Sequence, residues 1–286
     1  MKTLDTLLSW FGNHWPGKYF VSRFVAGEEM EDALKVAKVL NEQGFEAIVN
    51  FLGEEVKERS QVQENARIYL DLLKKIHFGK LKARVSIKPS QLGLKIDPRI
   101  YWHQMVSIGR DAYIYQIPLE IDMETEDTVV ETINETVGLA EYYPGLNLRQ
   151  AMAMNFKESF THLYNLTAAG VKVRLCKGAY SSKYSEKKVA ERYFSAASYL
   201  FRQKANPDFA THDLRLLEKI FRLRNEYPAA CGFQFLLGLR KKTWKELATR
   251  GERVGIYAPF GTNWLPYAKR RWKYLLKKLP SIILGN

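Results

Sequence analysis

Cysteine is scarce in this sequence: its 286 residues include only Cys176 and Cys231, both in apolar stretches. Two cysteines are too few for a disulfide-stapled secreted domain, so we expect two buried thiols in a cytoplasmic protein. No apolar run approaches the roughly 20 residues that cross a bilayer. The stretch Met1–Trp15 has an early Asp5 and no small-residue cleavage site, which argues against a secretory signal peptide.

The chain also lacks internal divisions. No linker rich in Ser, Gly or Pro interrupts it, and no low-complexity tract occurs. Hydrophobic residues make up 46% of the sequence and charged residues 26%, which excludes a disordered or collagen-like chain. We therefore expect one domain over residues 1–286, with a helical extension over about residues 1–40.

Several motifs with well-defined chemistry are missing. There is no G-x-x-x-x-G-K-[ST] phosphate loop, no H-E-x-x-H zinc helix, no G-x-S-x-G nucleophile turn and no C-x-x-C pair. The five histidines, at positions 14, 77, 103, 162 and 212, do not have the spacing of metal ligands. The sequence therefore predicts no P-loop, no metal site and no serine hydrolase.

Positive charge is in excess. Lys and Arg number 44 against 31 Asp and Glu, which gives a net charge of +13 and an isoelectric point of about 9.5. Such an excess favours nucleic acid, phosphate-bearing cofactors, carboxylate substrates or an acidic membrane surface as partners. Much of it lies in helical runs such as 183–192 and 269–278, where a solvated helix face is the simpler explanation. Charge alone does not choose among these partners.

Short strand-like segments alternate with amphipathic helical ones. The predicted strands are Glu46–Leu52, Ala83–Lys88, Ala112–Ile121, Leu146–Ala151, Val171–Cys176, Asp208–Thr211, Gly232–Leu236 and Arg253–Ala258. Eight such units in one undivided chain predict an α/β fold, a (β/α)8 barrel of the TIM type. A doubly wound sheet is the alternative, and the absence of G-x-G-x-x-G after the first strand weakens it.

In such a barrel the chemistry gathers at the carboxyl ends of the strands. Polar or ionisable side chains stand near nearly every predicted strand end: Glu54, Lys88, Asp122, Gln150, Arg174, Lys177, Thr211, His212, Gln234 and Tyr257. A solvated strand end explains any one of them, but their joint occurrence predicts a functional site.

Four segments combine charge, aromatic rings and glycine: VRLCKGAY at 173–180, FATHD at 209–213, IYAPFG at 256–261 and YAKRR at 267–271. Gly178 permits close approach to the backbone in the first. In the last, Tyr267, Arg270 and Arg271 are spaced i, i+3 and i+4, so they share one helix face. Paired guanidinium groups suit a carboxylate.

Taken in this order, the segments resemble the proline dehydrogenase family, FAD-dependent proline oxidases built on a distorted (β/α)8 barrel. The resemblance runs from about Phe20 to Lys278 and includes FLGE at 51–54, VSIK at 85–88 and IDME at 121–124. It implies a compact monofunctional enzyme whose C-terminal helix covers the substrate. The implied reaction is oxidation of L-proline to Δ1-pyrroline-5-carboxylate by hydride transfer to FAD. A quinone then takes the electrons, in the first step of proline catabolism to glutamate.

The resemblance also implies site residues. The catalytic positions are Lys88, Asp122, Arg174 and Tyr257. The substrate-binding positions are Lys88, Ala179, Tyr180, Leu236, Tyr257, Tyr267, Arg270 and Arg271. The arginine pair is implied to clamp the proline carboxylate, and Glu54 is implied to pair with Arg270 as a gate. The flavin-contacting positions are Gln150, Arg174, Lys177, Gly178, Thr211, His212 and Gln234.

Partners follow from the same resemblance: a membrane quinone, peripheral contact with the inner face of the cell membrane, and a pyrroline-5-carboxylate dehydrogenase downstream.

Four positions depart from the family pattern. This chain has Ser181 where the family usually has Trp, Asp213 where it has Asn, Gly232 where it has Glu, and Tyr274 where it has Glu. These departures concern flavin affinity and leave the substrate clamp unchanged.

Structural roles also fit several of these residues. Glu54 fits a helix N-terminal acid, Lys88 with Asp122 a structural ion pair, and His212 or Tyr257 core packing. A nucleic-acid-binding module is the second functional hypothesis, and it needs aromatic rings among Lys and Arg on one exposed face. Lys269–Lys278 is the plausible segment for it, although the substrate clamp explains this segment better. A third hypothesis is a family member that has lost proline oxidation or acts on another small imino acid.

Overall fold

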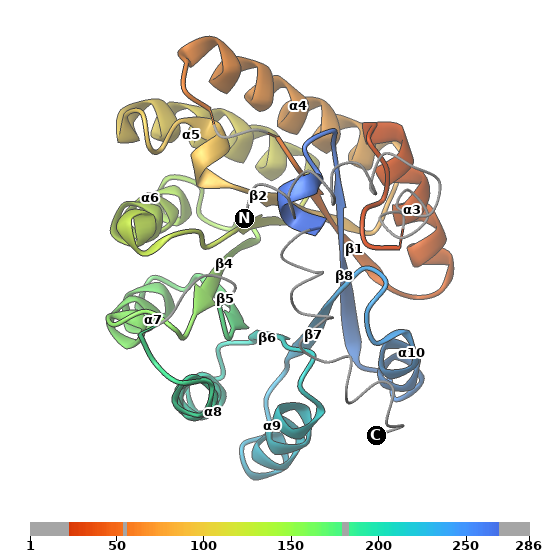
Figure 1. Ribbon diagram of the computed structural model, residues 1–286, viewed down its shortest axis with the longest axis vertical. Coiled ribbons are helices and arrows are strands. Elements are labelled where there is room, and N and C mark those ends of the chain that lie inside the picture. Colours follow the sequence, from red (N-terminus) through yellow and green to blue (C-terminus); the bar gives the residue numbers. More distant parts are fainter. Residues whose placement is uncertain (1–22, 54–55, 179–182, 269–286) are drawn as a thin grey trace, which may run out of the picture.

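Eight parallel strands form a closed barrel in the computed structural model, which describes residues 23–53, 56–178 and 183–268 (Figure 1). The strands are β1 (Glu46–Phe51), β2 (Ala83–Ile87), β3 (Leu119–Ile121), β4 (Leu148–Ala153), β5 (Lys172–Cys176), β6 (Asp208–Ala210), β7 (Gly232–Leu236) and β8 (Arg253–Phe260). They follow one another in sequence order, and β8 pairs with β1 to close the sheet. The predicted (β/α)8 barrel is confirmed, and the doubly wound alternative is wrong.

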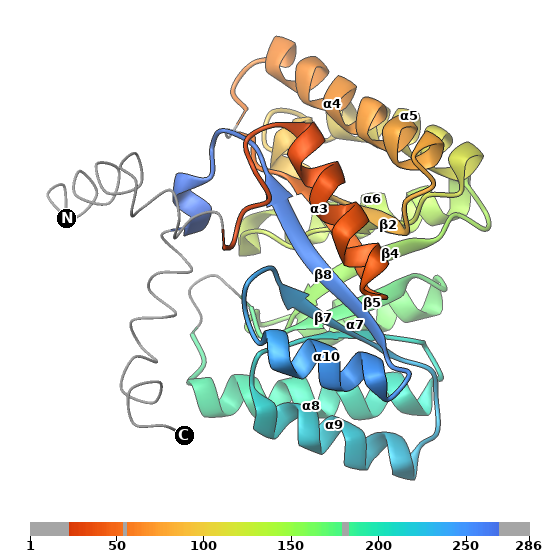
Figure 2. The ribbon, with the colours of Figure 1, turned by 90° about the vertical axis from the view of Figure 1, so that its right-hand side faces the viewer.

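Helices surround the barrel (Figures 1 and 2). They are α3 (Met30–Glu42), α4 (Arg59–Phe78), α5 (Pro98–Tyr115), α6 (Val129–Tyr142), α7 (Ser159–Ala168), α8 (Glu186–Arg202), α9 (Leu214–Glu226) and α10 (Lys241–Thr249), with short 3-10 turns η1 (Pro89–Leu92) and η2 (Glu126–Thr128). Each of α4 to α10 follows one strand, whereas α3 precedes β1 and packs against both β1 and β8. α3 overlaps the end of the helical extension expected over about residues 1–40; residues 1–22 lie outside the described part, so the extension stays a prediction.

The chain takes a different course after β8. Residues 265–268 form a helical turn that Figure 2 shows beyond the tip of β8 rather than against the barrel wall. Tyr267 in this turn is buried against Tyr257 and Leu52, and the Asn263 side chain donates a hydrogen bond to the Gly53 carbonyl at 3.2 Å. The start of the predicted C-terminal helix therefore lies over the carboxyl end of the barrel, and the rest lies outside the described residues.

Polar side chains begin the helices that follow β5 and β6. The Ser185 hydroxyl accepts a hydrogen bond from the Lys188 backbone N–H at the start of α8. The Asp213 carboxylate accepts one from the Arg215 backbone N–H at the start of α9. Such caps satisfy amide groups that have no partner within the helix. Asp213 is therefore held at the carboxyl end of the barrel by its own helix.

One predicted strand is wrong in its first half. Residues 112–115 of the predicted strand Ala112–Ile121 form the last turn of α5, and β3 covers only Leu119–Ile121. The buried residues Tyr101, Met105 and Ile108 recur at helical spacing, and Ala112 continues the same buried helix face. Gln116 then ends the helix with a left-handed backbone conformation, φ 56°. A short apolar run after a helix is ambiguous by pattern alone.

Two other strands extend further than the sequence predicted. β4 continues to Ala153 and β8 to Phe260, so Gln150 and Tyr257 lie within strands rather than at their ends. Pro259 within β8 has no backbone N–H to donate, but its carbonyl accepts a hydrogen bond from the Ala26 backbone N–H at 2.7 Å.

The predicted buried thiols are half correct. Cys231 is buried, but Cys176 at the end of β5 is only half-buried. Within the described ranges, no helix is long and apolar enough to cross a membrane.

Candidate active site

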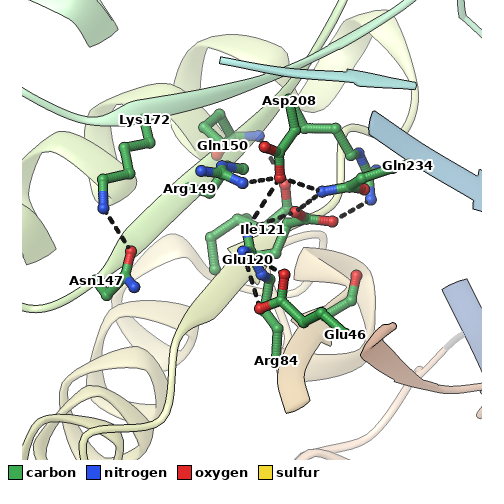
Figure 3. A network of polar contacts seen from close by, with 12 residues as sticks. Glu46, Arg84, Glu120, Ile121, Asn147, Arg149, Gln150, Lys172, Asp208 and Gln234 are labelled. Atoms are coloured by element: carbon green, nitrogen blue, oxygen red, sulfur yellow. Dashed lines mark hydrogen bonds and ion pairs between the residues drawn. The ribbon is translucent and has the colours of Figure 1, made fainter. Parts of the chain in front are cut away.

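Charged side chains occupy the barrel interior, where branched apolar residues usually dominate. Figure 3 shows part of this network: Glu46, Arg84, Glu120, Arg149, Asp208 and Gln234 lie close together, while Lys172 and Asn147 form a separate pair. Its buried charged members are Glu46, Arg84, Glu120, Asp122, Arg149, Arg174 and Asp208. Buried charges are costly unless they are paired and hydrogen-bonded, so each must be held by partners.

Glu120 on β3 is fully buried and joins three strands. Its Oε1 accepts a hydrogen bond from Arg174 Nη1, and its Oε2 accepts bonds from Gln234 Nε2 at 2.7 Å and Arg84 Nη1 at 3.2 Å. Burial alone raises the pKa of Glu120, but the charges of Arg174, Arg84 and Arg149 outweigh burial and lower it. Glu120 is therefore a carboxylate that orients Arg174.

A second cluster lies one step closer to the carboxyl end of the strands. Asp122 Oδ1 accepts hydrogen bonds from Arg174 Nη2 at 2.7 Å and from the Ser86 hydroxyl at 3.0 Å. Its Oδ2 accepts one from the Tyr257 hydroxyl at 2.8 Å, and the Arg174 guanidinium lies 5.7 Å from the Tyr257 ring centre. The structure thus brings together three of the predicted catalytic residues, Asp122, Arg174 and Tyr257.

Electrostatics fix the protonation states in this cluster. Burial lowers the pKa of Arg174, but Glu120 and other anionic neighbours outweigh burial and raise it well above its ordinary value. Burial and then Asp122 raise the pKa of Tyr257 well above its ordinary value. Arg174 therefore remains a cation and Tyr257 a neutral phenol that donates to Asp122.

Lys88, the fourth predicted catalytic residue, follows β2 beside this cluster. The Asp122 backbone N–H donates to the Ile87 carbonyl at 2.8 Å, which places the two strand ends side by side. The loops beyond them are joined by Glu124, which accepts bonds from the Ser90 backbone N–H and hydroxyl, both at 2.8 Å. Burial raises the pKa of Glu124. Lys88 and Asp122 are therefore neighbours at the carboxyl end.

Four predicted flavin-contacting residues cluster at the ends of β5 and β6: Lys177, Gly178, Thr211 and His212. Lys177 Nζ forms an ion pair with Asp213 at 2.9 Å. Burial alone raises the pKa of Asp213, but the Lys177 ammonium group outweighs burial and lowers it. His212 Nε2 accepts a hydrogen bond from the Leu236 backbone N–H at 3.3 Å.

Gly178 satisfies a strict steric requirement at the end of β5. Its φ is 116°, and a Cβ at this position would lie 2.1 Å from the Asn155 side-chain oxygen. Only glycine fits this conformation and this space without displacing Asn155. Gly178 therefore lets the Asn155 side chain pack directly against the backbone at the end of β5.

The two predicted flavin-contacting glutamines are engaged within the protein. Gln150 faces α6, where its Oε1 accepts a hydrogen bond from the Thr136 hydroxyl at 2.7 Å. Its Nε2 donates to the backbone carbonyls of Ile121 and Ala151. Gln234 uses its Nε2 for carboxylates inside the barrel. Contact of either glutamine with a flavin stays a prediction.

Several predicted residues lie outside the described part of the chain: Glu54, Ala179, Tyr180, Arg270 and Arg271, together with the departures Ser181 and Tyr274. The gate between Glu54 and Arg270 and the arginine clamp therefore stay predictions. Leu236 and Tyr267 are described, and both belong to the apolar cluster around Tyr257.

Glu120, Arg84 and Ser86 support the cluster from within the barrel, and none of them was predicted from the sequence. Their signal is alternation: Glu120 and Asp122 share a strand face, and so do Arg84, Ser86 and Lys88. A polar residue two or four positions before a strand-end acid or base lies on the same strand face and points into the barrel interior. This alternation could have found all three.

The closed barrel, with a charged and hydrogen-bonded cluster at the carboxyl ends of its strands, defines a TIM-barrel enzyme whose site is organised by electrostatics. A family model described as proline dehydrogenase matches residues 33–273. The chain therefore belongs to the proline dehydrogenase family and is an oxidoreductase.

Individual relatives agree. Proline dehydrogenase 1 of Bacillus subtilis subsp. natto is 30% identical over 261 residues, covering 87% of this chain and 84% of the relative. The proline dehydrogenase of Deinococcus radiodurans is 26% identical over 260 residues, with the same coverage. Proline utilization A from Bdellovibrio bacteriovorus, solved after inactivation by N-propargylglycine, shares the fold with a TM-score of 0.83 and 20% identity. That match covers 90% of this chain and 32% of the other.

Proposed function

We propose that this chain oxidises L-proline to Δ1-pyrroline-5-carboxylate, with FAD as the hydride acceptor and a quinone as the final electron acceptor. The observation that supports this most is the cation Arg174, fixed between Glu120 and Asp122 beside Tyr257. A rigid positive charge at this place is suited to stabilise negative charge that develops during a redox reaction.

The described residues fit a flavin without a Rossmann motif. Arg174 Nε is buried and has no hydrogen-bond partner among the described residues, and Lys177 adds a second cation. Gly178 follows β5 directly, and Thr211 and His212 follow β6, the next strand. FAD bound here would supply the hydride acceptor, while the protein supplies orientation and charge.

The chain's own residues would prepare the substrate amine. The pKa of the secondary amine of proline is near that of a lysine amine, ~10.4, and the amine must lose its proton before the ring carbon beside it gives up a hydride. Positive charge from Lys88 and Arg174 favours the neutral amine. Both oxygens of Asp122 are engaged, by Arg174 with Ser86 and by Tyr257. Asp122 therefore positions its neighbours rather than removing the proton.

The visible spectrum tests the proposal. The purified protein should show flavin absorption bands, or acquire them with added FAD, and L-proline should bleach them under anaerobic conditions. Alanine serves as the control because it is not a cyclic secondary amine. A protein that takes up no FAD, or whose flavin proline leaves oxidised, contradicts the proposal.

Substrate choice gives a second test. By resemblance to the family, Tyr257 would lie against C4 of the proline ring, where an added hydroxyl would clash and stay unpaired. We expect kcat/KM for L-proline to exceed that for 4-hydroxyproline by about tenfold or more. Tyr257→Ser should narrow this gap, mainly by slowing proline turnover.

Tyr257→Phe is the matched control for substrate choice. It loses the 2.8 Å hydrogen bond to Asp122 but keeps the ring, so the preference for proline should remain. Equal kcat/KM for the two imino acids in the parent enzyme would contradict the assignment of Tyr257.

The proposed partners extend beyond the barrel. A membrane quinone, peripheral contact with an anionic membrane face and a downstream pyrroline-5-carboxylate dehydrogenase belong to the same proposal, and the net charge of +13 suits the membrane contact. The nucleic-acid alternative depends on Lys269–Lys278, which lies outside the described residues.

A further inference from the structure

Basic side chains also gather at the opposite, amino-terminal end of the barrel. Arg84 and Arg149 are the second residues of β2 and β4, and Lys172 and Arg253 are the first residues of β5 and β8. We call these four residues the N-terminal cation cluster. It lies at the other end of the strands from the proposed proline site, to which Arg84 is connected through Glu120.

Among the described residues, carboxylates are too few to balance the cluster. Asp208 serves three arginines: its Oδ2 accepts a hydrogen bond from Arg149 and lies 3.6 Å from Arg84 Nη1, and its Oδ1 accepts one from Arg253 Nη2 at 2.7 Å. Glu46 pairs with Arg84 at 3.1 Å.

The third nearby carboxylate is shared with the other end of the barrel. Glu120 lies 3.2 Å from Arg84, but it also pairs with Arg174 in the proposed active site. Two carboxylates and a shared third therefore face four cations.

Lys172 and Arg253, the first residues of their strands, both donate to neutral oxygens, and Arg253 in addition shares Asp208 with the other arginines. Lys172 Nζ donates to the Asn147 side-chain oxygen at 3.0 Å, and Arg253 Nη2 donates to that of Asn206 at 2.9 Å. Lys172 is half-buried, and the Arg253 side chain keeps 34% of its surface exposed, so both can be reached from solvent. An amide oxygen satisfies a donor but does not neutralise its charge.

Buried donors behind them also lack acceptors. Arg149 is 1% exposed, and its Nε has no hydrogen-bond partner among the described residues. The Nε atoms of Arg84 and Arg253 are also buried without a hydrogen-bond partner among the described residues. β7 does not supply a further carboxylate, since a Cβ at Gly232 would lie 2.4 Å from Asp208 Oδ1 and 2.7 Å from Arg253 Nε.

Burial and neighbouring positive charge both act on the pKa values of these cations. Burial, together with the neighbouring charges of Arg84 and Arg253, lowers the pKa of Arg149 well below its ordinary value. Burial and then Arg149, Arg253 and Arg84 lower the pKa of Lys172. Burial is the largest cause of both shifts, and the neighbouring positive charges act in the same direction.

We propose that the amino-terminal mouth of the barrel binds a small inorganic oxyanion, held by Lys172 and Arg253. An oxyanion with several acceptor oxygens can bond an ammonium and a guanidinium group at once. It would supply the negative charge that the cluster lacks. Because the site would exist only in the folded chain, binding stabilises the fold by mass action.

Inorganic phosphate tests the proposal on the full chain, saturated with FAD so that the cations at the other end of the barrel are occupied. The melting temperature should rise with phosphate in a saturable way at millimolar concentrations. Sodium chloride at matched ionic strength should give a smaller change without saturation, because it only screens charge. Equal responses to the two salts would overturn the proposal.

Variants locate the site. Lys172→Gln should weaken phosphate binding by about tenfold or more, because it removes a charged hydrogen-bond donor. Lys172→Arg should bind nearly as the parent does. Lys242→Gln, on the exposed face of α10, is the control and should leave binding unchanged.

Two outcomes of the variant series overturn the proposal. One is parental phosphate binding by Lys172→Gln. The other is loss of phosphate binding in Lys177→Gln, which would move the anion to the carboxyl end of the barrel. If the protein takes up no FAD, the proposed function is contradicted but this site is not: the phosphate titration is then run on the protein alone, where Lys177→Gln still reports any binding at the carboxyl end of the barrel.

Discussion

Replacing Arg174 with alanine is expected to lower the free energy of unfolding by about 3–5 kcal/mol. Arg174 pairs with Glu120 and with Asp122 inside the barrel, and both carboxylates are buried. Truncation leaves the carboxylates of Glu120 and Asp122 without their shared partner. The resulting loss of free energy of unfolding should exceed the loss from removing any single ion pair at the surface. Chemical denaturation followed by circular dichroism measures it.

Arg224→Ala is the matched control for this prediction. Arg224 also forms a two-pronged ion pair, with Glu252 at 2.6 Å, but 27% of its side-chain surface is exposed. We expect a loss of about 1 kcal/mol there. If Arg174→Ala costs no more than Arg224→Ala, the buried network does not hold Arg174 as described.

The same Arg174 variant, under conditions where it stays folded, tests the proposed chemistry. The flavin's reduction potential should fall and hydride transfer from proline should slow, because a fixed positive charge favours the reduced anion. Arg174→Lys keeps the charge and should retain more of the parental potential. A potential and a reduction rate equal to the parent's would show that Arg174 does not act on the flavin.

The second large effect is expected at the arginine pair. Arg271→Met should raise KM for proline about 30-fold or more, because a desolvated ion pair to the substrate carboxylate is worth roughly 2–5 kcal/mol. Arg270→Lys should be nearly as harmful, since an ammonium group cannot reproduce the planar guanidinium fork. Steady-state kinetics with a dye acceptor measure both, and absorbance checks that FAD stays bound.

Glu54→Ala distinguishes the gate from the clamp. We expect it to loosen the closed state and to shift KM only modestly, because Glu54 would pair with Arg270 and not with proline. If KM stays near the parental value in both arginine variants, the carboxylate clamp is refuted, and with it the main argument for proline as the substrate.

The order of elements followed from the sequence because its causes are local. Apolar alternation, helical periodicity and the breaks between them predicted all eight strands in their order along the chain, including β5 and β7 almost to the residue. The prediction failed at 112–115, where an apolar run continued the buried face of α5 and only the cap at Gln116 separated helix from strand.

The sequence by itself determined the barrel and the residue types at its carboxyl end. The pairing of those residues was decided by the tertiary structure, since closure of β8 onto β1 brings Tyr257 to Asp122 across 135 residues of sequence. The tertiary structure also decided the partner of Gln150. Its residue type suited a flavin, but the strand's register turns its side chain toward Thr136 on α6. The physical reason is that hydrophobic patterns are read along the chain, whereas a buried charge finds its partner only where strands meet.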